Sequence, residues 1–189
     1  MSVKATSYFK GHFLMAMPAL ADPNFKQSVT CLSEHTDEGA VGIVINRVHP
    51  LLTAKLIFDE LDIAYEEKQA DIPIHIGGPV HQNELFILHG KPLEWQGSMK
   101  VSDELAMSNS RKILEAIAAG TGPADVLIAL GCAGWGPGQL EWEIGQNAWL
   151  TSPCQIDLIF HLPVDERWQT AIERLGIDLN LLSDTAGHA

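Results

Sequence analysis

A glycine-rich segment at residues 131–138 has the composition of a ligand-binding loop. It follows an apolar run, contains Trp135, and precedes an expected short helix that begins near Gln139 and Glu141. Glycines let a ligand approach the backbone closely, and a helix N-terminus offers free N–H groups. The spacing matches no dinucleotide or phosphate motif, and Glu141 puts negative charge where a phosphate would lie. The segment indicates either a site for a neutral or cationic ligand, with Trp135 as its floor or lid, or a turn with a packed indole and no ligand.

Histidine and glutamate side chains near expected strand ends could perform general acid and base chemistry. We expect His35, His75, His81 and His89 to converge on one edge of a sheet, because each falls near a strand end or turn. Glu34 directly precedes His35, but neighbouring strand residues point to opposite faces, so a direct pair between them is not expected. No His-Glu-x-x-His or Cys-x-x-Cys motif occurs, and the sequence therefore predicts no metal site.

Two arginines stand beside polar residues in an otherwise acidic chain. Arg47 follows Asn46 at the end of an apolar run, and Arg111 follows Ser110 at an expected helix start. A guanidinium can bind a carboxylate or phosphate through two parallel hydrogen bonds. Each arginine is therefore a candidate either for anion binding or for an internal salt bridge.

The three cysteines are widely spaced and odd in number, which suits reduced thiols in a reducing compartment. We therefore expect a cytoplasmic protein, with secretion as the lesser alternative. Cys31 and Cys154 fall on expected strands and are interpreted as core residues. Cys132 stands between an apolar strand and a helix start, where a thiol pKa can be lowered enough for reaction. It is either a redox-active thiol or an inert buried side chain.

Apolar patterning predicts the strands that must position these residues. Residues 28–34 alternate and residues 41–45 are rich in β-branched side chains, which predicts a hairpin. Residues 126–130 are apolar on both faces, so we expect a central strand that is covered on both sides. Further strands are expected at residues 74–76, 85–88 and 156–160.

Helical patterns lie between these strands. Thr53 can cap a short helix, and residues 108–119 carry an apolar stripe that ends at glycines. A final helix is expected to start at Pro163, with apolar residues at i, i+3, i+4 and i+7 counted from Trp168. Because strands occur both in hairpins and between helices, the pattern favours one mixed sheet with helices packed on it.

The composition narrows the class of protein. A length of 189 residues fits a single domain spanning residues 1–189. With 46% hydrophobic residues the chain is too apolar for a disordered tail, and no run approaches the roughly 20 apolar residues of a membrane span. A net charge of −12 disfavours strong nucleic-acid binding, which depends on basic side chains. We therefore expect no membrane association, and a small molecule or another protein as partner.

Short motifs along nearly the whole chain resemble the AlgH/YqgE family of uncharacterised bacterial proteins. Their order makes the resemblance specific. They are Met17-Pro18, Asp22-Pro23-x-Phe25, Ser28-Val29, Glu34-His35, Gly39-Ala40, Val44-Ile45-Asn46-Arg47, Gly77-Gly78-Pro79-Val80, Leu88-His89, Ser110-Arg111, Gly134-Trp135-Gly136, Gly138-Gln139-Leu140-Glu141 and Gly187-His188-Ala189. The resemblance implies an α+β fold with a mixed, mostly antiparallel, barrel-like sheet flanked by helices.

The resemblance implies less about function. One family name reflects a proposed role as a transcriptional regulator of polysaccharide synthesis, but no helix-turn-helix belongs to the family pattern or occurs here. Cys132 stands where members often carry an aromatic residue, which argues against a thiol mechanism shared by the family. Val48-His49 separates Arg47 from Pro50, whereas proline commonly follows the arginine directly in the family, so the loop after Arg47 departs from the pattern.

The function expected from the sequence is non-enzymatic small-molecule binding or regulation. The expected site is one cleft formed by polar residues and glycines at the ends of elements. Its candidate residues are Glu34, His35, Asn46, Arg47, Gly78, His89, Trp135, Gln139 and Glu141. The alternatives are a transcriptional regulator, with direct DNA binding disfavoured by charge, and a hydrolase or redox enzyme. The cofactor, if there is one, is unknown from the sequence.

Overall fold

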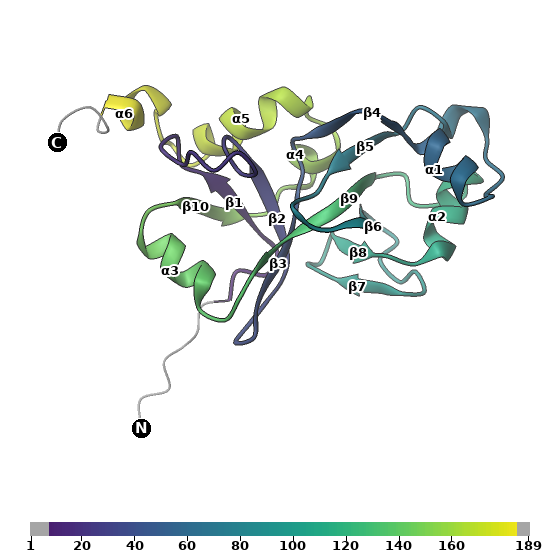
Figure 1. Ribbon diagram of the computed structural model, residues 1–189, viewed down its shortest axis with the longest axis horizontal. Coiled ribbons are helices and arrows are strands. Elements are labelled where there is room, and N and C mark those ends of the chain that lie inside the picture. The colour runs from purple at the N-terminus through teal and green to yellow at the C-terminus, as the bar shows by residue number, and fades with distance from the viewer. Residues whose placement is uncertain (1–7, 185–189) are drawn as a thin grey trace.

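The computed structural model describes residues 8–184, which form one curled sheet with helices around it (Figure 1). The strands are β1 (His12–Ala16), β2 (Val29–Thr36), β3 (Gly39–Val44), β4 (Val48–Thr53), β5 (Pro73–Ile76), β6 (Val80–His89), β7 (Ser98–Lys100), β8 (Ala106–Ser108), β9 (Val126–Trp135) and β10 (Trp149–Pro153). The helices are α1 (Ala54–Glu60), α2 (Arg111–Ala118), α3 (Gln139–Gly145), α4 (Ile156–Phe160), α5 (Arg167–Glu173) and α6 (Leu179–Asp184), and 3-10 turns lie at Glu67–Gln69 and Val164–Glu166. In this described part of the chain, no helix combines the length and apolar character needed to cross a bilayer.

Strand β9 organises the sheet because it pairs with three other strands. Its second half pairs antiparallel with β3, and its first half lies between β6, which is antiparallel, and β5, which is parallel. The strand order is β10-β1-β2-β3-β9-β6-β8-β7, with β4 and β5 attached beside this path. Between the described strands, every pairing except β5 with β9 is antiparallel. The expected α+β fold with a mixed, mostly antiparallel, barrel-like sheet is confirmed.

The side chains of β9 alternate between two hydrophobic cores. Leu127 and Ala129 pack in a core with α4 and α5, whereas Ile128 packs on the opposite face with α1 and α2. Successive side chains of a strand point to opposite faces, so a strand covered on both sides is apolar throughout. The prediction of a central strand over residues 126–130 is thereby confirmed.

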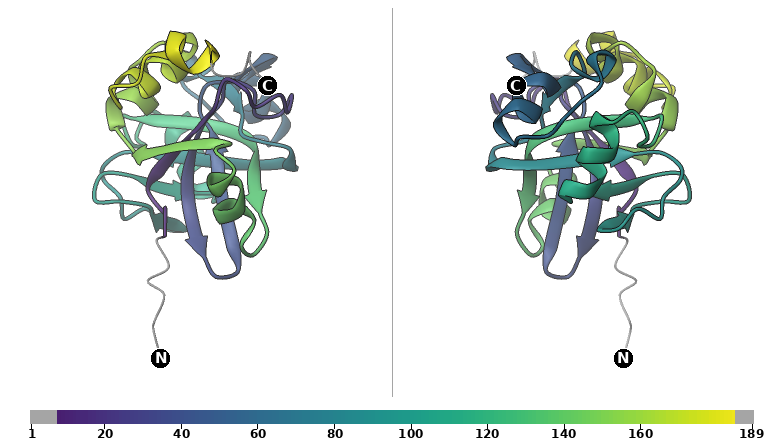
Figure 2. Two further views of the ribbon diagram at one scale, coloured as in Figure 1. Left: turned by 90° about the vertical axis from the view of Figure 1, so that its left-hand side faces the viewer. Right: turned by 90° about the vertical axis from the view of Figure 1, so that its right-hand side faces the viewer.

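Helix α3 covers a third apolar cluster at the far end of the sheet. Leu140 of α3 packs there with Leu14, Leu32, Trp135 and Trp149. The turned views place α3 at one end of the molecule and α1 with α2 at the other (Figure 2). The ends of β9 therefore lie under different helices.

Several expected elements are confirmed by the structure. The hairpin of residues 28–34 and 41–45 corresponds to β2 and β3, and the strands at 74–76 and 85–88 lie within β5 and β6. Ser110 caps α2 by accepting a hydrogen bond from the Ile113 backbone N–H. Arg111 forms an internal salt bridge with Glu115 at 2.7 Å, which was one of the two alternatives expected for it. Thr53 stands at the N-cap of α1, but its side chain makes no capping bond.

Three expectations in the C-terminal half are wrong. Residues 156–160 form helix α4 and not a strand. So short an apolar run fits either element, and here only the packing decides. The strand over 126–130 does not end at the glycines, because β3 pairs with its continuation through Gly134 to Trp135. The helix expected from Pro163 is α5, which begins at Arg167 after a 3-10 turn, and it is not the final helix because α6 follows it.

Candidate functional site

The structure divides the candidate residues among three places. Glu34, His35, Trp135, Gln139 and Glu141 gather where the β2–β3 hairpin meets α3; Asn46, Arg47 and Gly78 lie beyond the other end of β3; His89 ends β6. Trp135 and the partner of His89, Val126, stand at opposite ends of β9. Nine strand steps span about 30 Å. The structure therefore does not bring the candidates into one shared cleft.

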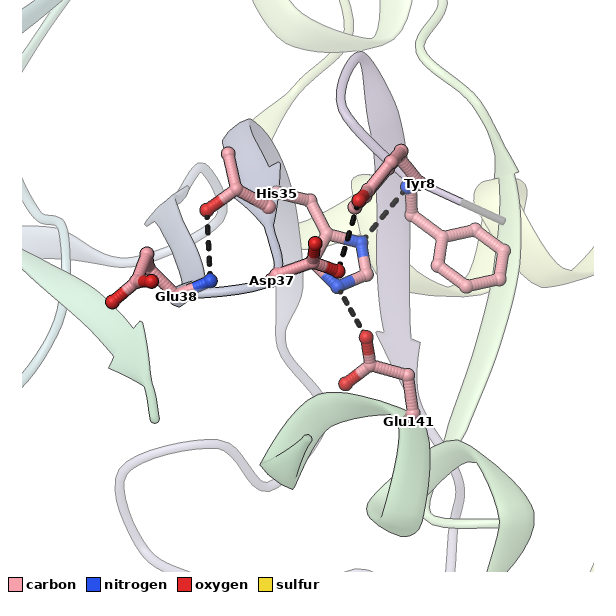
Figure 3. Close-up of polar contacts among 7 residues, drawn as sticks. Tyr8, His35, Asp37, Glu38 and Glu141 are labelled. Carbon is pink, nitrogen blue, oxygen red and sulfur yellow. Dashed lines mark hydrogen bonds and ion pairs between the residues drawn. The ribbon is translucent and has the colours of Figure 1, made fainter. Parts of the chain in front are cut away.

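His35 is held by hydrogen bonds at both ring nitrogens (Figure 3). Its Nδ1 accepts from the Phe9 backbone N–H at 2.9 Å, so in the neutral ring Nε2 carries the proton and donates to Glu141 Oε1 at 2.9 Å. The ring of Phe9 stacks on the imidazole with 5.8 Å between centroids. Glu34 points to solvent while His35 is buried, as the strand alternation predicts. The hydrogen bond between His35 and Glu141 joins β2 to α3, and neither ring nitrogen of His35 is left free.

Trp135 is a packed indole and not the lid of a cavity. It is 6% exposed, and its ring contacts those of Phe25 and Trp149 with centroid distances of 5.9 and 6.0 Å. Its Nε1 donates to Glu143 Oε2 at 2.9 Å, and Trp149 Nε1 donates to the same oxygen at 2.8 Å. Gln139 Nε2 donates to Glu143 Oε1 at 2.9 Å. We call this arrangement the Glu143 bridge; it fastens α3 to the sheet.

Arg47 donates to backbone carbonyls and not to a carboxylate. Its Nη1 reaches the Pro23 carbonyl and its Nη2 the Lys26 carbonyl, each at 2.9 Å. Asn46 accepts from the Val29 backbone N–H at 2.8 Å. The hollow beside Arg47 has a volume of about 70 Å³, room for water and little more. These side chains hold the segment between β1 and β2 against the end of β3.

The expected convergence of four histidines on one sheet edge is wrong. His81 and His89 lie at opposite ends of β6, which spans ten residues, so the turns they occupy are far apart. His89 is fully buried and its Nε2 bonds to Ser98 Oγ at 2.9 Å, and burial lowers its pKa. His75 lies on β5, which pairs with β9, whereas His35 lies on β2, which pairs with β1 and β3.

The cysteines are buried or nearly so. Burial raises the pKa of Cys132, and the nearby Glu84 carboxylate raises it further, so little thiolate is present at neutral pH. Cys31 Sγ lies 3.3 Å from Sγ of Cys154, which follows β10 rather than lying on it. The inert alternative for Cys132 fits this environment better than the redox-active one. Among residues 8–184, no group of three or more His, Cys, Asp or Glu side chains is placed to hold a metal ion.

A larger hollow, of about 500 Å³, lies between the loop after α2 and the segment that links α4 to α5. Apolar side chains such as Ile117, Leu127 and Phe160 form part of its wall. Two buried polar side chains also line it, His75 from β5 and Arg167 from the start of α5. We call it the His75–Arg167 hollow. Its volume falls within the roughly 300 to 1,000 Å³ of small-molecule sites.

His75 is a buried polar side chain without a partner. It is 4% exposed, and neither ring nitrogen makes a hydrogen bond within the described residues. Burial, and then the positive charge of Arg167, lower its pKa to about 4, while the Ile128 backbone, which lies outside hydrogen-bonding geometry, opposes this shift as the smallest of the three effects. The ring is therefore neutral at neutral pH, with one donor and one acceptor unused. Leaving such groups unpaired is unfavourable by roughly 1 to 3 kcal/mol each.

Acid is expected to destabilise the fold through His75. The folded pKa of about 4 lies below the ordinary value of 6.5, so between these pH values the unfolded chain binds more protons. The free energy of unfolding then falls as the pH is lowered through this window, by up to about 3 kcal/mol. Urea unfolding at several pH values should show that His75→Leu removes this loss, whereas His81→Leu, at an exposed histidine, retains it. Equal pH dependence in His75→Leu and the parent protein would contradict the assignment.

Arg167 is a buried cation without a carboxylate partner. It is 5% exposed, its Nε donates to the Leu162 carbonyl at 3.0 Å, and its Nη1 donates to the Ile45 carbonyl. Burial lowers its pKa to about 10, so it stays charged at neutral pH. Within the described chain, no Asp or Glu oxygen lies within 4.0 Å of its guanidinium. Arginine is rarely buried without a partner of opposite charge.

Arg167 was not a candidate from the sequence, and His75 was considered only as one of four histidines expected at a sheet edge. A weak signal was present for both. His75 interrupts the apolar residues Ile74 and Ile76, and Arg167 precedes the buried Ala171 by one helical turn. A polar group inside an apolar pattern is the feature that could have identified them.

Known proteins resemble this chain along its whole length. A family described as AlgH-like matches residues 13–180. The UPF0301 protein of Thioalkalivibrio sulfidiphilus is 52% identical over 185 residues, covering 98% of this chain and 99% of the relative. The UPF0301 protein of Desulforapulum autotrophicum is 48% identical over 189 residues, covering 100% of both.

A solved structure agrees with these matches. The solution structure of the AlgH protein from Pseudomonas aeruginosa is 47% identical, covers 100% of both chains and superposes with a TM-score of 0.78. The Gly187-His188-Ala189 motif lies outside the described residues, but the other motifs lie within them. The resemblance found in the sequence is confirmed, and the chain belongs to the AlgH-like family.

Proposed function

We propose that this protein is a non-enzymatic, cytosolic protein that binds a small molecule and acts as a regulator. The observation that carries the proposal is the His75–Arg167 hollow, where one buried polar side chain has no hydrogen-bond partner and another has no counter-charge. Buried polar groups in folded proteins are almost always satisfied, so such groups facing a hollow suggest a bound molecule that completes them. An apolar wall with a few polar groups is the usual composition of a ligand site.

The hollow supports this proposal better than the candidate residues derived from the sequence do. His35, Arg47 and Glu141 already hydrogen-bond within the chain. A ligand could use their bonded atoms only by displacing those contacts, each worth about 1 kcal/mol. His75 requires no such exchange. We therefore assign the earlier candidates a positioning role and place the ligand in the hollow.

The other functions considered have weaker physical support. A net charge of −12 opposes the phosphate neutralisation on which DNA binding depends. The raised pKa of Cys132 opposes a thiolate nucleophile. No observation in the described residues favours a second candidate function.

Native mass spectrometry of freshly purified protein tests the proposal. We expect an adduct below about 1 kDa, the size range that such a hollow accommodates. The ligand should then shift the NMR amide signals of residues that line the hollow, including His75, Ile117 and Phe160.

A blocking variant and a matched control sharpen this test. Ala124 is exposed and lines the hollow, so Ala124→Trp should fill its mouth and abolish the adduct. Ala119 is exposed just after α2 and is not among the lining residues, so Ala119→Trp should leave the adduct unchanged. Absence of any adduct, together with no amide shift from a small-molecule cell extract, would refute ligand binding.

A further inference from the structure

The charge around the His75–Arg167 hollow differs from that of the whole molecule. The chain has 24 acidic and 12 basic residues, yet the lining contains Arg167 and neither Asp nor Glu. Asp71, Asp125, Asp165 and Glu166 neighbour lining residues in sequence without belonging to the lining, and the Asp125 carboxylate is paired with His161 at 2.8 Å. The charged side chain that lines the hollow is therefore a cation, although the protein as a whole is negative. A concave site lined by one sign of charge concentrates ligands of the opposite sign.

A second cation lies at the rim of this hollow. Gly120 belongs to the lining, and a Cβ placed on it would be 3.5 Å from Lys68 Nζ. Lys68 forms no ion pair with a carboxylate in the part of the chain that the structure describes. An approaching anion would thus meet an exposed ammonium before it reaches the buried guanidinium.

Arg167 and His75 offer complementary contacts to such an anion. Two nitrogens of the guanidinium bind the carbonyls of Leu162 and Ile45, and its Nη2 bonds to nothing among the described residues. His75 has an unused N–H and an unused acceptor nitrogen. A carboxylate or phosphate oxygen can accept from a guanidinium and an imidazole N–H together, and charge-assisted hydrogen bonds of this kind are strong.

We infer that the occupant of the His75–Arg167 hollow is a small organic anion. Its carboxylate or phosphate binds Arg167 and His75, and its apolar part lies against Ile117, Leu127, Ile159 and Phe160. The inference rests on the proposed function and names the chemical class of its ligand.

Three probes of similar shape test the charge requirement. Benzoate and phenyl phosphate carry the two anionic groups, and benzamide is the neutral counterpart of benzoate. We expect at least one of the two anions to bind at least tenfold more tightly than benzamide in NMR titrations, with amide shifts at the hollow. Tighter binding of benzoate would indicate a carboxylate ligand, and tighter binding of phenyl phosphate would indicate a phosphate ligand.

Variants assign the effect to the two side chains. Arg167→Met should weaken binding of the preferred anion at least tenfold and leave binding of benzamide unchanged. Arg174→Met should change neither, because Arg174 is exposed directly after α5, pairs with Asp157 and does not line the hollow. Because Arg167 also binds two backbone carbonyls, its variant must first be shown to fold. His75→Leu provides an independent test, since the ring makes no hydrogen bond whose loss would unfold the protein. The His75→Leu variant should bind the preferred anion several-fold more weakly.

The outcomes separate this inference from the proposed function. Binding of benzamide as tight as that of both anions, or unchanged anion binding in the folded variants, would overturn the anionic ligand and leave small-molecule binding in place. A neutral molecule found in the hollow of the purified protein would also overturn the anionic ligand and leave small-molecule binding in place. No shift from any probe at about 10 mM, together with no adduct in native mass spectrometry, would overturn both.

Discussion

Replacing Gly78 with alanine is expected to lower the free energy of unfolding by roughly 4 kcal/mol or more. Gly78 has a φ of +152°, which other residues rarely adopt. A Cβ there would lie 2.3 Å from the backbone C and O of Cys132 and 2.5 Å from the N of Ala133. These atoms belong to β9 and cannot move without disturbing its pairing with β3 and β6. Urea denaturation of the variant measures the loss.

Two other glycines provide controls for this prediction. Gly134 lies on β9 itself, but a Cβ there would come no closer than 3.7 Å to another side chain, that of Val80. Its alanine variant should change stability by about 0.5 kcal/mol or less. Gly138 has a φ of +73° and open space around it. Gly138→Ala should therefore lower the free energy of unfolding by only about 1 kcal/mol, the cost of a left-handed backbone conformation at alanine. If Gly78→Ala is no worse than Gly138→Ala, the close approach to β9 is not what requires glycine at position 78.

The elements predicted correctly are those whose own residues carry a distinct apolar pattern or capping signal. Residues 126–130 are apolar at every position because two cores cover them, and Ser110 marks the start of α2. Strands β7 and β8 have three residues each and owe their existence to pairing with each other and with β6. A segment so short carries no period of its own. Its sequence could not predict it.

The candidate site was harder to predict because partners lie far apart in the chain. Glu141 is 106 residues from the histidine it binds, so the sequence could show two polar residues but not that they satisfy each other. The proposed site at His75, in contrast, was identified because this histidine has no hydrogen-bond partner. Only coordinates reveal that neither ring nitrogen of this histidine has one. Polar residues at element ends therefore predicted structural contacts better than they predicted the proposed ligand site.

Replacing Glu143 with alanine is expected to lower the free energy of unfolding by roughly 3 to 5 kcal/mol. The Glu143 bridge receives the indole N–H groups of Trp135 and Trp149 at one carboxylate oxygen, at 2.9 and 2.8 Å. These tryptophans are only 6% and 4% exposed. Both buried donors would therefore lose a charged acceptor at once, and α3 would lose two of its hydrogen bonds to the sheet. Urea unfolding followed by tryptophan fluorescence measures the effect at the same rings.

Two comparisons test whether the bridge itself causes the loss. Glu141→Ala removes one hydrogen bond, from His35 to a carboxylate that is 39% exposed, and should lower stability by only about 1 kcal/mol. In a double-mutant cycle, Trp149→Phe removes the N–H but keeps the ring, so its combination with Glu143→Ala should show a coupling energy of about 1 kcal/mol or more. Coupling near zero, or a Glu143→Ala loss no larger than that of Glu141→Ala, would mean that water replaces the carboxylate. Helix α3 would then be held by Leu140 and the apolar contacts around it, and not by the shared oxygen of Glu143.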